Sequence, residues 1–404
     1  LARVKAKAER HSFEQVGDAR NASPLRCVSL VRLEREIAKR LAAGEALEES
    51  MLTLAGLRRV EYVLVCPESR DLTIAGPAGD WLVSDERRLI ATDTGLPVVR
   101  LDDLLTFLRR DARQAFGCSI DPRPQSLAAA QQYLGSHTIP PGRRGREKWL
   151  EEVRQSVGLQ DLSYRGLSAD SRVACVLGEA DYHMKLIGMG LADGTAGMRS
   201  YLDTIEAKPG ADAPAVGAVR WWFEMNYAAI ETSEARDAFK LVGQGVKLLS
   251  ENEAIAAHGA RRPTGKTDEA AQAFAASFTT GFARLCEKYA VYAELRNLFD
   301  LALVAALIQT EGLAQRASWS PGLLQDEAHL PLPRYQAPTT VESAANLRVA
   351  QGRQVLAQVS GGVLAQPAVV VKRRVRPATE YGPLTNHTGH PPQGETGWWW
   401  DVAP

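Results

Sequence analysis

The amino-acid sequence predicts an α+β fold on three observations. Apolar residues recur at the helical spacing of three and four within residues 267–311. Runs rich in β-branched and aromatic residues, typical of strands, occur at residues 60–66 and again over 219–250. The apolar and charged fractions, 45% and 24%, are those of an ordinary globular protein.

The first predicted unit is a mixed α+β domain at residues 25–138, which follows a polar N-terminal arm at residues 1–24. It should open with a helix that Ser29 caps. Residues 60–66 and 72–76 should pair as a hairpin across the turn PESRD. Further short strands and helices are expected at residues 81–83, 88–92, 102–110, 118–120 and 124–134.

A Pro/Gly/Arg-rich stretch at residues 139–145 is the predicted domain boundary. The second unit, residues 146–253, should combine helices with a sheet. The apolar stripe along residues 173–187 predicts one of its helices. Short polar breaks divide residues 219–250 into four strands, which predicts an antiparallel meander.

Residues 267–314 should form a buried helical pair that packs on the central domain. Thr267 can cap the first helix, and Phe274, Phe278 and Phe282 lie on one face of it. The second helix is apolar around most of its circumference, which predicts burial on all sides.

The last predicted unit is a Pro-rich docking tail at residues 315–404. Two β-runs are expected to form a hairpin about a turn at Ser360, Gly361 and Gly362. The tail ends in Trp398, Trp399 and Trp400, which are a large apolar area to leave in water. We expect these tryptophans to dock on a partner or on the chain itself.

Composition excludes several classes of function. The formal net charge is +0, so nothing in it favours nucleic acid, and the basic patch at residues 372–376 is expected to guard an exposed strand edge. The longest apolar run, residues 301–308, is far too short for a transmembrane segment. The five cysteines form no C-x-x-C pair and are interpreted as buried thiols, with one disulfide among the first three as the alternative in an exported protein.

The best candidates for chemistry are Glu179, Asp181 and His183. On a helix, Glu179 and His183 would share one face at a spacing that an acid–base pair or a metal could use. The alternative is an ordinary polar helix face, because no third ligand is close in sequence and Asp181 is spaced to pair with Lys185. We therefore expect no metal or other cofactor.

Two apparent motifs fail on spacing or residue type. The stretch HGARRPTGKT at residues 258–267 resembles a phosphate-binding loop but has five residues where that motif needs four. GCSID at residues 117–121 resembles a nucleophile elbow but has Asp121 where glycine is required. Trp221 and Trp222 suggest a ligand platform, and strand geometry would place one of them inside and the other outside.

Long segments of the chain resemble a known family. They are SLVRLEREIAKRLAAG, RRVEYVLVCPESRDLTIAGP, EADYHMKLIGMGL, VYAELRNLFDLALVAALI and the terminal WWWD. They are similar to the domain of unknown function 1598 family, which is bacterial, chiefly planctomycete and mostly predicted to be exported. The resemblance implies an extracytoplasmic location and carries no assigned activity. The chain begins at Leu1, and the sequence leaves open whether an export signal preceded it.

Three functions remain. The first is an exported, non-enzymatic structural or interaction protein that forms a homo-oligomer or a larger assembly through its C-terminal tail. The second is a hydrolase or metal-dependent enzyme that uses Glu179, Asp181 and His183. The third is a small-molecule or polysaccharide binder that uses Trp221 or Trp222.

Overall fold

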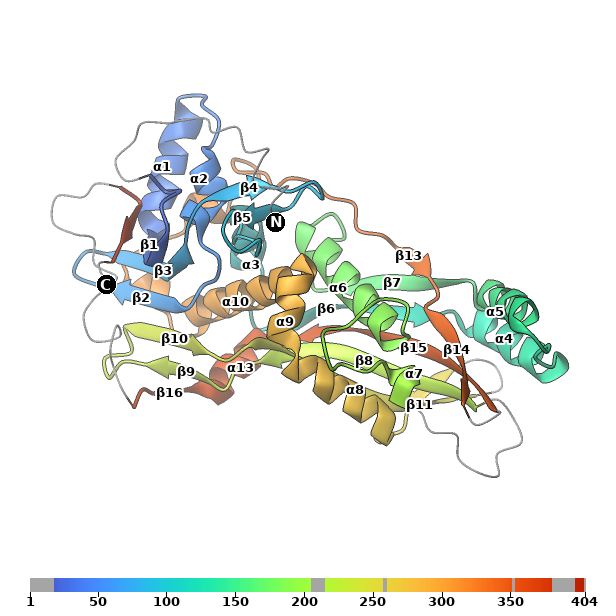
Figure 1. The fold of residues 1–404 in the computed structure, drawn as a ribbon. Coiled ribbons are helices and arrows are strands. Elements are labelled where there is room, and N and C mark those ends of the chain that lie inside the picture. The colour runs from blue at the N-terminus through green and yellow to red at the C-terminus, as the bar shows by residue number, and fades with distance from the viewer. Residues whose placement is uncertain (1–17, 205–214, 257–259, 351–352, 380–396, 403–404) are drawn as a thin grey trace.

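The computed structural model confirms the α+β fold and describes residues 18–204, 215–256, 260–350, 353–379 and 397–402. Within these residues most strands belong to two large sheets, and a separate two-stranded hairpin accompanies them. Figure 1 shows the seven-stranded sheet on the left, the eight-stranded sheet on the right and helix α10 in the middle of the molecule.

The seven-stranded sheet has the order β16-β9-β10-β2-β3-β1-β17. Its strands come from four separate parts of the chain: β1 (Ser23–Ser29), β2 (Tyr62–Cys66), β3 (Asp71–Ala78), β9 (Ala229–Thr232), β10 (Ala238–Val242), β16 (Val375–Pro377) and β17 (Trp399–Asp401). The expected hairpin is present as β2 and β3. Helix α1 (Leu30–Ala42) packs on this sheet, and the Ser29 side chain caps it by accepting a hydrogen bond from the Arg32 N–H at 3.0 Å, as predicted.

The eight-stranded sheet has the order β12-β11-β8-β15-β6-β7-β13, and β14 pairs with β15. Its strands are β6 (Phe116–Pro122), β7 (Leu159–Arg165), β8 (Ala215–Asn226), β11 (Gly245–Ile255), β12 (Arg261–Pro263), β13 (Thr340–Glu342), β14 (Ala345–Ala350) and β15 (Arg353–Ala365). Helices α6 (Arg172–Gly188), α8 (Glu269–Thr280) and α10 (Ala290–Thr310) contact one face, which we call the inner face (Figure 1). The opposite face is called the outer face.

Helix α10 is the centre of the core. All but four of its 21 residues are buried, as its apolar circumference predicts. Phe278 of α8 and Phe282 of α9 (Phe282–Lys288) pack edge-on against Tyr292 of α10, with ring centroids 5.3 and 6.1 Å apart. The cap of α8 is Asp268 rather than the predicted Thr267, because the Asp268 carboxylate accepts the Ala271 N–H at 2.7 Å.

The remaining elements are short or peripheral. They are α2 (Glu49–Leu52), a 3-10 turn (Leu54–Gly56), β4 (Trp81–Val83), β5 (Leu89–Ala91), α3 (Leu101–Leu108), α4 (Pro124–Ser136), α5 (Arg143–Val157), α7 (Tyr201–Thr204), α11 (Leu313–Arg316), α12 (Gly322–Gln325) and α13 (Pro367–Arg374). Strands β4 and β5 form the separate hairpin.

The predicted boundary at residues 139–145 does not separate two sheets. It covers part of the loop between α4 and α5 and the first residues of α5, and these two helices pack against each other. Both large sheets combine strands from the predicted domains 25–138 and 146–253 with strands from the predicted tail 315–404. Composition correctly marks residues 139–142 as a loop, but residues 143–145 are helical. Strands on both sides of this stretch pair within the same sheets, so it does not divide the chain into separate sheets.

The four strands predicted at residues 219–250 are all present, but they do not form one meander. Strands β8 and β11 pair with each other in the eight-stranded sheet. The hairpin of β9 and β10 leaves that sheet and joins β2 in the seven-stranded sheet. The β8–β11 segment therefore links the two sheets.

The predicted hairpin turn at Ser360–Gly362 is wrong. These residues lie inside β15, whose antiparallel partner β14 precedes it. A Cβ added to Gly361 would lie 1.9 Å from the Trp221 carbonyl oxygen, and one added to Gly362 would lie 2.1 Å from that of Cys118. The glycines thus permit a close approach of neighbouring strands. The second predicted β-run is helix α13, so the basic patch lies mainly on a helix and not along a strand edge.

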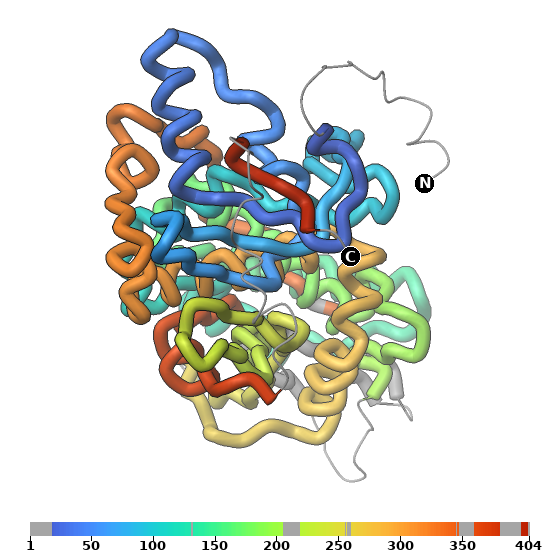
Figure 2. The backbone as a smooth tube through the Cα atoms, turned by 90° about the vertical axis from the view of Figure 1, so that its left-hand side faces the viewer, coloured from blue at the N-terminus to red at the C-terminus, as the bar shows by residue number. Residues whose placement is uncertain are grey.

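The C-terminal tail folds back onto the start of the chain. Strand β17 pairs with β1, with Trp400 opposite Cys27 (Figure 2). Trp398 and Trp400 are buried, and Trp399 lies 4.5 Å from the Arg26 guanidinium. The three tryptophans predicted as partner-docking residues therefore pack on their own chain, and docking on a partner stays a prediction.

Candidate functional site

Helix α6 carries the three candidate catalytic residues, and their environments differ. The helix begins after Ser171, whose hydroxyl accepts the Ala174 N–H at 3.2 Å. Its inner stripe, which includes Val173, Val176 and Leu177, is buried as predicted.

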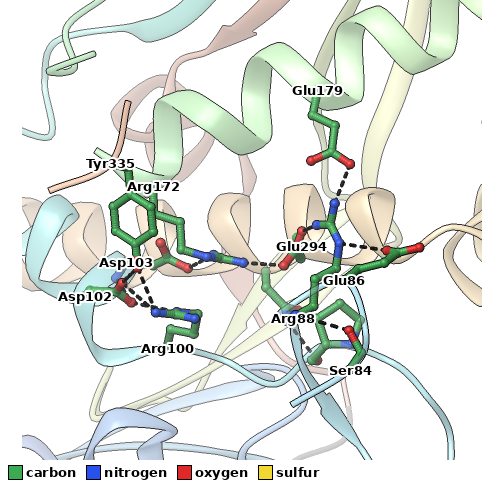
Figure 3. A network of polar contacts seen from close by, with 12 residues as sticks. Ser84, Glu86, Arg88, Arg100, Asp102, Asp103, Arg172, Glu179, Glu294 and Tyr335 are labelled. Atoms are coloured by element: carbon green, nitrogen blue, oxygen red, sulfur yellow. Dashed lines mark hydrogen bonds and ion pairs between the residues drawn. The ribbon is translucent and has the colours of Figure 1, made fainter. Parts of the chain in front are cut away.

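Glu179 lies near the edge of a buried charge network (Figure 3). Its carboxylate pairs with Arg88, which also binds Glu86 and the buried Glu294 of α10. These ion pairs raise the pKa of the Arg88 guanidinium in spite of its burial. Glu179 therefore has a cationic partner already and helps to fasten the β4–β5 hairpin to α6.

The network continues to α3 through Arg172, which bridges Glu294 and Asp103. Burial raises the pKa of Asp103 to about 7, against the pull of the Arg172 charge. Burial also acts to raise the pKa of the adjacent Asp102, but the hydrogen bond and charge of Arg100, together with the Arg172 charge and the Tyr335 hydrogen bond, outweigh it and the net shift of the pKa is downward. Tyr335 closes this end by donating to Asp102 at 2.9 Å.

Asp181 is directed into the protein interior. It pairs with Lys185 at 2.8 Å, and both side chains have no solvent exposure. Lys185 also donates to the Ile120 carbonyl of β6 at 3.3 Å. A Cβ on Gly361 would lie 3.1 Å from the Asp181 carboxylate, so that glycine also leaves room for the ion pair. Burial raises the pKa of Asp181.

His183 packs against the aromatic rings of Tyr289 and Tyr292 at the start of α10. Its Nδ1 lies 2.8 Å from the Tyr292 hydroxyl, and its ring meets that of Tyr289 edge-on at 4.3 Å. Burial lowers the pKa of His183, so the imidazole is neutral at neutral pH.

Glu179 thus faces a surface ion pair, Asp181 faces the interior beside the sheet, and His183 faces an aromatic cluster. The structure does not bring them together in one pocket. In the part of the chain that the structure describes, no three His, Cys, Asp or Glu side chains are placed to hold a metal ion. The phosphate-loop-like stretch includes the edge strand β12, and GCSID lies inside β6.

A groove on the outer face of the eight-stranded sheet offers a different site. It encloses a cavity of about 440 Å³ between strands β7, β6, β15, β8 and β11. Trp221 points to the inner face, where it is fully buried against Phe274. Trp222 lines the groove. The predicted inside–outside alternation of these two tryptophans is confirmed.

Two hydroxyls and two guanidinium groups lie in the groove with Trp222. The Ser119 and Ser163 hydroxyls are 2.9 Å apart on adjacent strands. Arg220 lies over the Trp222 ring at 5.7 Å, and the Trp222 Nε1–H donates to Glu224 at 3.0 Å. Arg165 lines the far side on β7. Arg220 and Glu224, which flank Trp222 on the same face of β8, therefore hold the indole in place.

A smaller cavity of about 140 Å³ adjoins the groove toward α13. The two cavities share Glu224 and Leu364, and the second adds Lys247 together with Arg373 and Arg374 of α13. The outer face therefore has an elongated recess that is open to a ligand larger than a single ring.

Part of this site lies in a stretch that is similar to a known family. Residues 118–201 match the family described as Protein of unknown function (DUF1598). This segment runs from β6 to the start of α7, so it contains the groove residues Ser119, Ser163 and Arg165 as well as all of α6. The match confirms the suggested resemblance for residues 118–201, which include the segment EADYHMKLIGMGL.

No curated protein and no solved structure matches the chain significantly. In the described ranges, no helix is long and apolar enough to cross a membrane.

Sequence reasoning missed the groove apart from Trp222. Arg165 and Arg220 are 55 positions apart in sequence, and they share a face only because β6 and β15 lie between β7 and β8. One local signal for the groove was available. Arg220, Trp222 and Glu224 occupy alternate positions, which places three side chains with polar groups on one face of a strand.

Proposed function

We propose that the protein is a non-enzymatic binding protein, and that its ligand is a ring-bearing small molecule or polysaccharide held in the outer-face groove. The observation that carries this proposal is the fixed Trp222 indole in a recess that also holds hydroxyl and guanidinium groups. Ligand sites commonly combine one aromatic or apolar surface with a few convergent polar groups.

The disposition of α6 supports a binding role over catalysis. Glu179, Asp181 and His183 are each engaged with a different neighbour, so they offer no shared substrate position. General acid–base work requires such groups within hydrogen-bonding reach of one substrate.

We also propose an extracytoplasmic location, which the family resemblance supports. Self-association through the tail is less favoured by the arrangement of β17, because its tryptophans are already packed against β1 and Arg26. The strands at the two ends of each sheet order, as far as they are described, have three residues each, whereas β14, which pairs with β15 beside that order, has six. The three-residue ends give little backbone for a second copy to pair with.

The test is a binding measurement with Trp222→Ala. Isothermal titration with dextran, carboxymethyl-dextran and dextran sulfate should show binding of at least one polymer without any release of reducing ends. Loss of the indole should weaken that binding about tenfold, in line with the ~1–3 kcal/mol that aromatic stacking contributes to ring ligands.

The control is Leu159→Ala, which truncates an exposed apolar side chain at the opposite end of β7. It should leave affinity unchanged. Failure of all three polymers to bind, or hydrolysis of a bound polymer, would contradict the proposed function.

A further inference from the structure

We infer that the groove takes an anionic saccharide, whose carboxylate or sulfate groups are bound by Arg165 and Arg220 while one sugar ring stacks on Trp222. This inference rests on the proposed binding function and adds the charge of the ligand. The charge of the ligand follows from which charged side chains of the groove already have partners within the protein.

Both carboxylates of the groove are engaged within the protein. Glu224 accepts the Trp222 Nε1–H and pairs with Lys247 at 3.2 Å. Glu251 accepts the Gly265 N–H at 2.7 Å. Glu251 is opposite Arg220 in the β8–β11 register, yet the two side chains form no ion pair.

The two arginines are not engaged in this way. Across the described ranges, neither Arg165 nor Arg220 has a hydrogen-bond or ion-pair partner, and the Arg220 Nε is buried without one. A buried donor left without an acceptor is costly, and a guanidinium presents paired N–H groups that match the oxygens of a carboxylate or sulfate. An anionic group in the groove would satisfy these donors.

The neighbours of Arg220 indicate that the ligand carries a ring next to its anionic group. Arg220 and Trp222 are neighbours on one face of β8, with the guanidinium 5.7 Å from the indole ring, so a ligand that meets both must carry its charge at a comparable distance from a flat apolar surface. The C–H face of a pyranose fits against the negative face of an indole. The Ser119 and Ser163 hydroxyls can each donate and accept, as sugar hydroxyls require.

The adjoining cavity extends the same charge pattern. The two cavities together are lined by five positively charged and two negatively charged side chains: Arg165, Arg220, Lys247, Arg373 and Arg374, against Glu224 and Glu251. An excess of positive charge along an elongated recess favours a polymer with charges on successive units over a single sugar.

The experiment compares three polymers with the same backbone: neutral dextran, carboxymethyl-dextran and dextran sulfate. The native protein should bind at least one of the charged forms tenfold or more tightly than dextran, and the two charged arms distinguish carboxylate from sulfate as the anion. The double variant Arg165→Gln/Arg220→Gln should lose this preference. Thermal melting of the variant confirms that it folds.

The matched control is Arg143→Gln/Arg144→Gln, which removes the same two charges from the exposed start of α5. It should retain the preference within about twofold. A groove variant that keeps the preference, or equal binding of dextran through Trp222, would overturn the inference and leave the binding function standing. Tighter binding of a single-stranded oligothymidine than of either charged dextran would also overturn it. If no polymer binds, the proposed function itself fails.

Discussion

A buried ion pair lies where helix α6 packs on the eight-stranded sheet. The Asp181–Lys185 pair has no solvent exposure and lies between α6 and β15. Two charges buried together are tolerated because each compensates the other, whereas one alone is not. The sequence predicted this pair from its spacing of four but not its burial, because burial depends on the sheet that covers it.

Removing one member of the pair should be far more damaging than removing both. Lys185→Met leaves Asp181 buried without a counter-charge, and we expect a loss of about 3–5 kcal/mol in the free energy of unfolding. The double variant Asp181→Leu/Lys185→Met should recover most of that loss. Urea denaturation of the two variants measures the difference, and equal destabilisation by both would contradict the explanation.

Asp103 should make stability depend on pH. Burial raises its pKa from 3.8 to about 7, so the native state binds a proton that the unfolded state has released between these values. The native state is then favoured at low pH, and the Asp103 contribution to stability is lost as the pH rises from about 4 to about 7. Asp103→Asn should flatten the stability profile in this window.

The measurement is the urea midpoint of the native protein and of Asp103→Asn at several pH values from 4 to 8. Glu45→Gln, an exposed change of the same type, serves as the control and should keep the native profile. A steeper profile in Asp103→Asn would contradict the assigned pKa.

At the level of elements, local patterns predicted helices and strands well but not how they are joined. The apolar stripes of α1, α6, α8 and α10 follow from spacing alone. The prediction of a hairpin turn within β15 is wrong, because Ser-Gly-Gly is also a sequence typical of hairpin turns. Only the positions of β6 and β8 on either side show that these glycines serve close strand contacts.

Gly361→Ala should therefore be severely destabilising. Its Cβ would lie 1.9 Å from a backbone oxygen of β8, and strands held in a sheet cannot separate locally to relieve that overlap. We expect a loss of ~3 kcal/mol or more, at the upper end of overpacking effects. Thermal melting should show a clearly lowered Tm.

Gly135→Ala is the matched comparison. This glycine lies in α4, and an added Cβ would meet no atom within 4 Å. Alanine should stabilise that helix by ~0.5–1 kcal/mol, since glycine is unfavourable in a helix. Similar destabilisation by both substitutions would show that strand spacing is not the cause.

At the level of the whole molecule, β17 of the C-terminal tail pairs with β1 and is the outermost strand of the seven-stranded sheet on that side. Arg26 is fully buried and donates to both oxygens of Asp401, at 2.7 and 2.9 Å. This pairing could not be predicted, because nothing local in either segment identifies the other. The groove was hidden for the same reason, since its arginines meet only through the order of the strands.

Asp401→Asn should weaken this closure. The Asp401 side chain is 39% exposed, so solvent screening limits the loss in the free energy of unfolding to about 1–2 kcal/mol. Urea denaturation measures this loss.

Light scattering of the native chain and of a truncation after Gly397 tests whether the tail mediates self-association. Equal particle masses are expected if β17 acts within one chain, and a fall in mass on truncation would instead assign the tail to assembly.

The pairing of Arg26 with Asp401 also bears on the order of synthesis and folding, because the two residues are 375 positions apart. A ribosome synthesises Arg26 long before Asp401, so β1 keeps an unpaired edge until residues 399–401 have been made. Contacts this distant in sequence slow folding and prolong exposure of strand edges. The seven-stranded sheet therefore stays incomplete beside β1 while all the residues between these two strands are being synthesised.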